Sequence, residues 1–112
     1  MQTNSKKITR AAAVNLAKRY IEQCEQRGLP IRKAVLFGSV VTNTAGKESD
    51  IDLLLVSDAF IADSLHNWKL LAPITAKYYD IEPHPYPTNN FLKGDPFLNE
   101  VLKHGIEIKR AA

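Results

Sequence analysis

Two aspartates, Asp50 and Asp52, open an apolar run in the stretch SDIDLLLV. In an extended strand, residues two apart lie about 7 Å from each other and point to the same face, so both carboxylates would face one point. Placing two like charges together in an apolar setting costs free energy unless a cation compensates. Carboxylate oxygens in this arrangement suit two Mg²⁺ or Mn²⁺ ions, so the pair predicts a divalent-metal site.

A metal site of this kind gains a third carboxylate from a neighbouring strand. The stretch YYDIEPHPY reads as a strand in which Asp80, Glu82 and His84 alternate onto one side. Asp80 and Glu82 are therefore both candidates for the third carboxylate. His84 shares their face and could touch a metal or phosphate there. A single histidine between two prolines is more often structural than a ligand, so we interpret it as structural.

Gly38 and Ser39 end an apolar strand in the stretch VLFGS. Glycine permits a tight turn whose backbone N–H groups point outward, and Ser39 adds a hydroxyl beside them. A turn of exposed donors is an anion site. A phosphate at Gly38-Ser39 and metal ions at Asp50 and Asp52 together describe a nucleoside triphosphate with its bound cations.

The elements that position these residues follow from hydrophobic spacing and from glycine and proline. The sequence predicts helices over residues 9–27, 59–71 and 96–103, strands over 31–39, 50–57, 78–86 and 106–109, and a polar connection over 42–49. Pro73 should kink or restart the second helix, and Trp68 should lie in that helix's core face. The prolines of the third strand place it at a sheet edge. The order predicts an α/β (α+β) fold, a small mixed sheet flanked by helices.

Composition narrows the class of protein. The chain has 112 residues, 45% hydrophobic and 24% charged, as is typical of one globular domain. Its net charge of +3 arises in residues 1–33, where the Lys/Arg residues are spread along the predicted helix, so we expect a solvated face rather than a nucleic-acid site. The single Cys24 excludes an internal disulfide and should be a core residue. The start is polar and no apolar stretch reaches about 18 residues, so we expect a cytoplasmic protein without a membrane span.

The spacing of Gly38-Ser39 from Asp50-Ile51-Asp52 resembles the signature of nucleotidyltransferases of the DNA polymerase β superfamily. The strand SDIDLLLV and the ending LKHGIEIKR resemble the minimal nucleotidyltransferase (MNT) group over nearly the whole chain. This resemblance implies the nucleotidyltransferase fold, with residues 1–112 as one minimal domain. It also implies an enzyme that uses Mg²⁺, with two ions, to transfer AMP from ATP to an acceptor hydroxyl.

By the same resemblance, Asp50, Asp52 and a third carboxylate hold the metal ions. The third carboxylate also orients or activates the acceptor hydroxyl, and the family's pattern overlays it best on Glu82, with Asp80 as the alternative. The family often reads Gly-Ser-x-Ala-Arg-Gly at the loop, whereas Thr42 stands here at the arginine position. The missing positive charge can come from Lys47 or from the basic N-terminal segment, so we count Lys47 with Gly38 and Ser39 as nucleotide-binding.

The family also implies a partner. MNT proteins resemble antitoxins that are encoded beside a HEPN-domain ribonuclease toxin and, in some systems, AMPylate a tyrosine of that toxin. We therefore expect a HEPN toxin as partner and acceptor. The departure at Thr42 motivates a second hypothesis, a non-catalytic antitoxin that neutralises its partner by contact alone.

Overall fold

The computed structural model of the chain describes residues 8–42 and 51–109. The helices are α1 (Arg10–Gln26), α2 (Ser39–Thr42), α3 (Ser64–Thr75), α4 (Thr88–Lys93) and α5 (Pro96–His104). The strands are β1 (Lys33–Phe37), β2 (Ile51–Ser57), β3 (Ile81–Pro87) and β4 (Ile106–Lys109), in the sheet order β3-β2-β1-β4. β2 and β3 are parallel, whereas β1 pairs antiparallel with β2 and β4. The predicted α/β fold with a small mixed sheet is confirmed.

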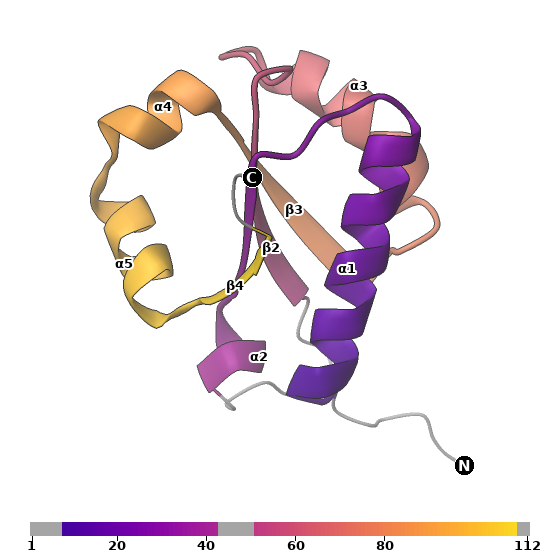
Figure 1. The fold of residues 1–112 in the computed structure, drawn as a ribbon, viewed down its shortest axis with the longest axis vertical. Helices are drawn as coiled ribbons and strands as arrows, with labels where there is room; N and C mark the ends of the chain where they lie inside the picture. The colour runs from indigo at the N-terminus through magenta and orange to yellow at the C-terminus, as the bar shows by residue number, and fades with distance from the viewer. Residues whose placement is uncertain (1–7, 43–50, 110–112) are drawn as a thin grey trace.

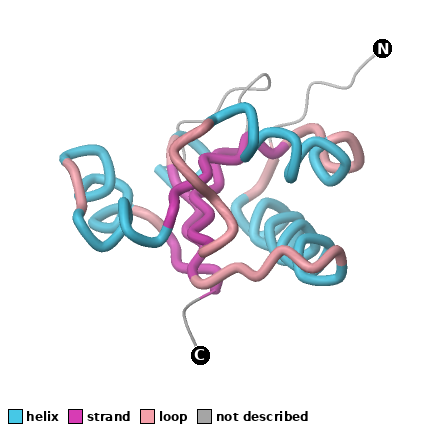
Figure 2. The backbone as a smooth tube through the Cα atoms, turned by 90° about the horizontal axis from the view of Figure 1, so that it is seen from above, coloured by secondary structure: helices cyan, strands magenta, loops and turns pink. Residues whose placement is uncertain are grey.

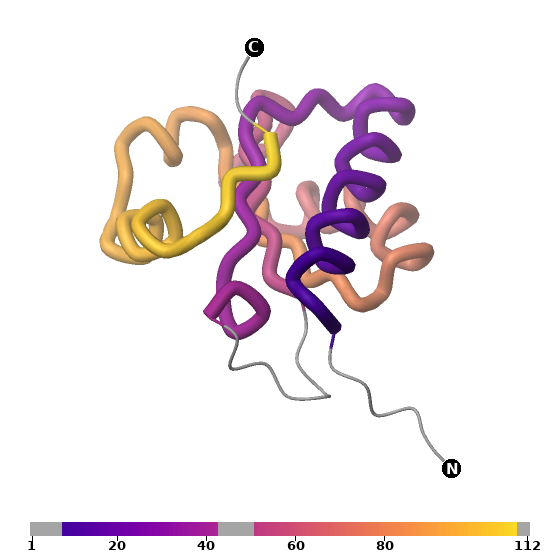
Figure 3. Tube along the Cα trace, turned by 60° about the horizontal axis from the view of Figure 1, so that its bottom comes forward, coloured from indigo at the N-terminus to yellow at the C-terminus, as the bar shows by residue number. Residues whose placement is uncertain are grey.

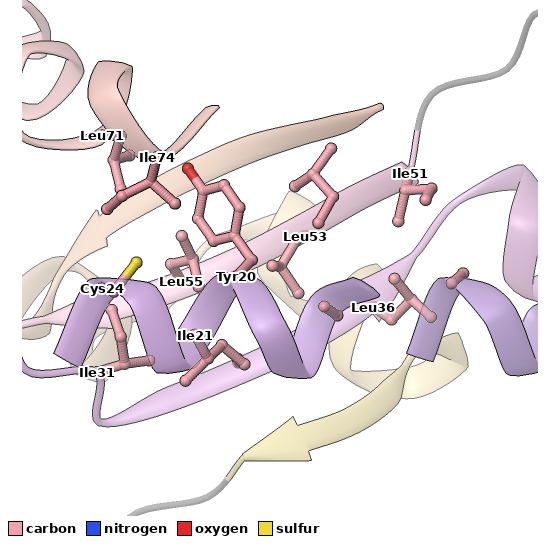
Figure 4. Packing of buried hydrophobic residues seen from close by; sticks show 14 of the residues in the cluster. Tyr20, Ile21, Cys24, Ile31, Leu36, Ile51, Leu53, Leu55, Leu71 and Ile74 are labelled. Carbon is pink, nitrogen blue, oxygen red and sulfur yellow. The ribbon is translucent and has the colours of Figure 1, made fainter. Parts of the chain in front are cut away.

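Helices cover both faces of the sheet (Figures 1 and 2). α1 and α3 lie on one face, and α4 and α5 lie on the other. The α1 side holds the larger core, in which the buried stripe of α1 meets the inward side chains of the strands (Figure 4). The hydroxyls of Tyr20 and Thr75 are 2.8 Å apart and join α1 to α3. Cys24 is fully buried in this core, as predicted.

The α5 side holds a smaller core. Leu54 and Val56 of β2 pack there with Leu98 and Val101 of α5. Asp95 caps α5, since its side chain accepts the backbone N–H of Leu98 at 2.8 Å. β2 therefore has both faces covered, which agrees with its almost continuous apolar sequence.

β3 is an edge strand, as its prolines predicted. The carbonyl of Asp80 accepts the backbone N–H of Ile51 at 2.8 Å, so the even-numbered residues that follow direct their backbone groups toward β2. Pro83, Pro85 and Pro87 then face outward, where a missing N–H breaks no ladder bond. The strand begins at Ile81 rather than at residue 78, because the Ile81 N–H closes a turn with the carbonyl of Tyr78 at 2.9 Å.

The second predicted helix begins later than residue 59. α3 starts at Ser64, where the side chain of Asp63 accepts the backbone N–H of Leu65. The segment before it is held by the buried Asn67, whose amide accepts the Ile61 N–H at 3.0 Å and donates to the Ile61 carbonyl at 2.7 Å. The side chain of Asn67 thus provides hydrogen-bond partners for the backbone of a non-helical segment. Hydrophobic spacing alone does not distinguish such a segment from helix.

One expectation for α3 is wrong, and a second is excluded in part. Trp68 is 51% exposed rather than in the core, because the buried face of the helix is formed by Asn67, Leu71 and Ile74. Of the two effects expected of Pro73, a kink or a restart, the structure excludes the restart, because the helix continues past Pro73 to Thr75. Packing of Leu71 and Ile74 against the core holds this last turn, although proline removes one backbone hydrogen bond.

Two short helices, α2 and α4, were not predicted. Each is about two turns or less, so neither contains enough residues to display a helical period. α2 follows β1 directly and packs against α1 through the buried Val40 and Val41. The polar connection predicted over 42–49 lies, apart from Thr42, outside the described residues.

Candidate active site

The turn between β1 and α2 requires a glycine for two reasons. Gly38 has a φ of +84°, a conformation that residues with a Cβ rarely adopt. A Cβ at this position would also lie 2.4 Å from Oδ2 of Asp52. Phe37 pairs with Asp52 across the antiparallel strands, and this register brings the turn against the carboxylate. The predicted anion turn and the predicted metal ligand are therefore neighbours, with Ser39 as the first residue of α2.

Three side chains converge beside this turn. Asp52 of β2 and Glu82 of β3 are register partners in adjacent parallel strands, and His84 is two residues further along β3. One ligand atom from each of the three lies within 4.8 Å of the others. The Nε2 of His84 lies 3.1 Å from Oδ1 of Asp52. These three residues make a group that fits a divalent cation.

The other predicted site residues are placed differently. Asp80 precedes β3, is exposed, and does not belong to this group among the described residues. The geometry therefore favours Glu82 of the two candidates for the third carboxylate. Asp50 and Lys47 lie outside the described residues, so their predicted roles rest on the sequence.

The sequence predicted that His84 shares the face of the carboxylates, but it did not predict the contact with Asp52. The sequence did contain one indication of it: His84 is two residues from Glu82, so both side chains point to the same face of β3. The ring packs edge-on against Phe37, with centroids 4.9 Å apart, and lies 6.1 Å from the ring of Phe97. Two aromatic neighbours thus hold the imidazole while its Nε2 reaches the carboxylate.

An aromatic row continues from this histidine along the α5 side. Phe97 stacks on Tyr86 with centroids 6.3 Å apart, and the Tyr86 hydroxyl donates to Asp95 at 3.1 Å. Burial, together with this hydrogen bond, raises the pKa of Tyr86. The phenol stays protonated and serves as a donor to the residue that caps α5, which ties the site-bearing strand to that helix.

A cation from α1 lies at the end of α2. The guanidinium of Arg10 donates to the carbonyl of Val41, directly before Thr42, the position at which the family often has arginine. Figure 3 shows α2 at the end of β1, close to the start of α1. Arg10 belongs to the basic N-terminal segment that the sequence analysis named as one source of the missing charge.

The remaining histidines are apart from this group. The Nε2 of His66 lies 3.2 Å from the carbonyl of Ala59, in the segment before α3. His104 lies in the last turn of α5, with Nε2 3.6 Å from Glu100. Both contacts are local, so these two side chains serve the structure of their own segments.

The arrangement places the turn that the sequence predicts for phosphate beside carboxylates that it predicts for cations. A family model described as nucleotidyltransferase domain matches residues 17–105 of the chain. The chain belongs to the nucleotidyltransferase family. This confirms the family and the fold that the Gly-Ser and Asp-x-Asp spacing predicted. No curated protein matches the nucleotidyltransferase chain.

Solved structures share the fold of this nucleotidyltransferase at low sequence identity. A proposed nucleotidyltransferase from Sulfolobus solfataricus matches with a TM-score of 0.64 and 14% identity, over 95% of this chain and 90% of the other. A toxin-antitoxin structure with AMP-PNP matches with a TM-score of 0.59 and 18% identity, over 84% and 73%. An MNT antitoxin in complex with a tri-AMPylated HEPN toxin of Shewanella oneidensis matches with a TM-score of 0.55 and 18% identity, over 88% and 73%.

None of the helices in residues 8–42 and 51–109 has the length and apolar character needed to cross a bilayer.

Proposed function

We propose that this nucleotidyltransferase transfers AMP from ATP to an acceptor hydroxyl, and that the acceptor is a tyrosine of a cognate HEPN toxin. The observation that carries the proposal is the convergence of Asp52 and Glu82 beside the Gly38-Ser39 turn, in a chain of the nucleotidyltransferase family. The fold shared with an MNT antitoxin that was crystallised with an AMPylated toxin supports the acceptor. The proposal takes residues 1–112 as one minimal domain in the cytoplasm, where ATP is available.

The proposed roles divide between phosphate and metal. Asp50, Asp52 and Glu82 would hold Mg²⁺, with two ions expected, and bound metal would neutralise charge that develops on the phosphates. The turn at Gly38 and Ser39 would position the triphosphate. Lys47 and Arg10 would supply positive charge near it in place of the arginine that Thr42 replaces.

The reaction is a displacement at the α-phosphorus of ATP. The acceptor oxygen forms a bond to that phosphorus, the bond to the bridging oxygen of the β-phosphate breaks, and pyrophosphate leaves. Glu82 would orient the acceptor hydroxyl and accept its proton. Its carboxylate is exposed, so an acceptor on another molecule can reach it.

The alternative is an antitoxin that binds its HEPN partner without chemistry. Thr42 at the family's arginine position favours this hypothesis, because loss of a cation beside the triphosphate weakens nucleotide binding. The two hypotheses make different predictions: neutralisation of the toxin requires the proposed metal carboxylates if AMP is transferred, and does not require them if contact alone is sufficient.

The test uses the full chain, the protein encoded beside it, Mg²⁺ and ATP labelled on the α-phosphate. We expect label on a tyrosine of the partner with the wild type and none with Asp52→Asn. Asp58→Asn is the matched control, because Asp58 follows the opposite end of β2 and pairs with Arg32 at 2.9 Å. Absence of label with the wild type, together with toxin neutralisation by both wild type and Asp52→Asn, would overturn transfer in favour of contact alone.

A further inference from the structure

The imidazole of His84 lies in the same group of side chains as the carboxylates of Asp52 and Glu82. Its Nε2 lies 3.1 Å from Oδ1 of Asp52, and the Glu82 carboxylate lies in the same group within 4.8 Å. The register of β2 with β3 explains this: Glu82 faces Asp52 directly, and His84 is the next residue on that face. The position of the imidazole thus follows from the backbone and does not depend on a flexible loop.

The aromatic neighbours of His84 fix its ring. Phe37 and Phe97 contact it at centroid distances of 4.9 and 6.1 Å, from β1 and α5. The His84 side chain is 28% exposed and that of Asp52 is 25% exposed, so each side chain is partly open to solvent while most of it is packed. A ligand that is held in place before the ion arrives loses little freedom on binding.

The separation of the two atoms suits two ligands of one ion. Mg²⁺ and first-row transition ions have ligands at about 2.1 Å, so neighbouring ligands at right angles in an octahedral shell are about 3 Å apart. The 3.1 Å between Nε2 of His84 and Oδ1 of Asp52 agrees with this. The same distance also allows a hydrogen bond between the two side chains, and the experiment below separates these two roles.

Nitrogen in the ligand set changes the metal that the site prefers. Mg²⁺ favours oxygen ligands, whereas imidazole binds first-row transition ions, and Mn²⁺ accepts carboxylate oxygen and imidazole nitrogen together. We propose that His84 is a metal ligand beside Asp52 and Glu82, and that its nitrogen shifts the preference of this site from Mg²⁺ toward Mn²⁺. This inference rests on the proposed function for its site, but concerns the identity of the metal.

The experiment measures metal binding to the full chain without ATP or partner. Loss of the spectrum of free aqueous Mn²⁺ in electron paramagnetic resonance gives the Mn²⁺ affinity, and competition gives that of Mg²⁺. We expect His84→Gln to weaken Mn²⁺ binding by about tenfold or more and Mg²⁺ binding much less. His104→Gln, which changes an exposed histidine of α5, should leave both affinities unchanged.

A second variant keeps the inference testable if His84→Gln disturbs the strand. His84→Asp should bind Mg²⁺ more tightly relative to Mn²⁺ than the wild type does, because oxygen replaces nitrogen in the ligand set. Equal affinities of wild type and His84→Gln for Mn²⁺ would overturn the proposal. So would equal losses for both ions, since these indicate that His84 only positions Asp52.

Failure of this inference and failure of the proposed function are distinguishable. Preferred Mn²⁺ binding without transfer of label to a partner in either metal would uphold the ligand role and refute transfer. Transfer of label, with no effect of His84→Gln on the ratio of the Mn²⁺ and Mg²⁺ affinities, would uphold transfer and refute the ligand role of His84.

Discussion

At the scale of single residues, the site depends on a close approach between backbone and carboxylate. Gly38 allows the turn after β1 to lie against Asp52, with no space for a Cβ. The sequence predicted both residues from spacing alone. It did not decide between Asp80 and Glu82 as the third carboxylate, because residues two apart on a strand face the same side. The register with β2 distinguishes them, since it pairs Glu82 with Asp52. The sequence did not predict the contact of His84 with Asp52, because that contact depends on the neighbouring strand β2.

Gly38→Ala should abolish most of the nucleotidyl-transfer activity, while the protein stays folded. The new Cβ must displace the Asp52 carboxylate, so we expect nucleotidyl transfer to fall by about a hundredfold or more. Gly28→Ala is the matched control, since Gly28 has a φ of +81° but no atom within 4 Å of the added Cβ. Both variants should lose about 1 kcal/mol of stability from backbone strain in urea unfolding, but Gly28→Ala should keep its activity. Equal activities would contradict this role of Gly38.

Glu82→Gln should separate the two candidates for the third carboxylate. We expect the rate of transfer to fall by about a hundredfold or more, because the proposed metal ligand and proton acceptor is lost. Asp80→Asn should change the rate less than about threefold, since the contact of Asp80 with β2 uses its backbone carbonyl. Label-transfer rates of the two variants provide the measurement, and the opposite ranking would assign the role to Asp80.

Arg10→Gln should weaken ATP binding by roughly fivefold to tenfold. The expected cause is the loss of one cation near the triphosphate, at the end of α2. Arg19→Gln is the control, because Arg19 is an exposed arginine further along α1. Calorimetric titration with ATP measures both affinities. Equal affinities would show that Arg10 serves only the packing of α1 on α2.

At the scale of elements, hydrophobic spacing predicted every strand and the three longest helices. The missed helices α2 and α4 are short. Val40 and Val41 of α2 pack in the larger core, and Phe91 of α4 packs against the smaller one. The displaced start of α3 depends on the hydrogen bonds of Asn67 to Ile61, which no periodicity reveals. An apolar pattern also does not say which of two possible stripes is buried, as the exposed Trp68 shows.

The stripe of α3 gives a direct test of this packing. Leu71→Ala should cost about 3 kcal/mol, because Leu71 is 1% exposed and its loss leaves a cavity. Trp68→Ala should cost only about 1 kcal/mol, although it removes a larger side chain, because water already reaches half of it. Urea unfolding of both variants is the measurement. A larger loss for Trp68→Ala would place the indole in the core after all.

At the scale of the whole molecule, the sheet separates a large core from a smaller one that carries the site. Burial in the large core raises the pKa of Cys24 from 9.0 to about 12 and also raises the pKa of Tyr20. The unfolded chain releases these protons at lower pH than the folded chain does. Between the two pKa values the unfolded state therefore binds fewer protons, and stability falls as the pH rises.

We expect the free energy of unfolding to decrease above about pH 9, by up to about 1.4 kcal/mol per pH unit for Cys24. Tyr20 should add to the slope above about pH 10. Cys24→Ala removes the first contribution, so its stability should stay level to about pH 10 and then fall. Urea unfolding at a series of pH values measures this. The same onset in both proteins would show that Cys24 does not titrate on unfolding.

The prolines of β3 have a consequence for how copies of this protein can associate. The outward backbone positions of this strand hold Pro83, Pro85 and Pro87, and the N–H of Ile81 is bonded within its own turn. The outer edge of β3 thus offers no free N–H to an incoming strand. Pairing of sheets between copies would have to use β4, and two copies joined there would present β3 at both ends. Growth of the native sheet by strand pairing at β4 would therefore end at a dimer.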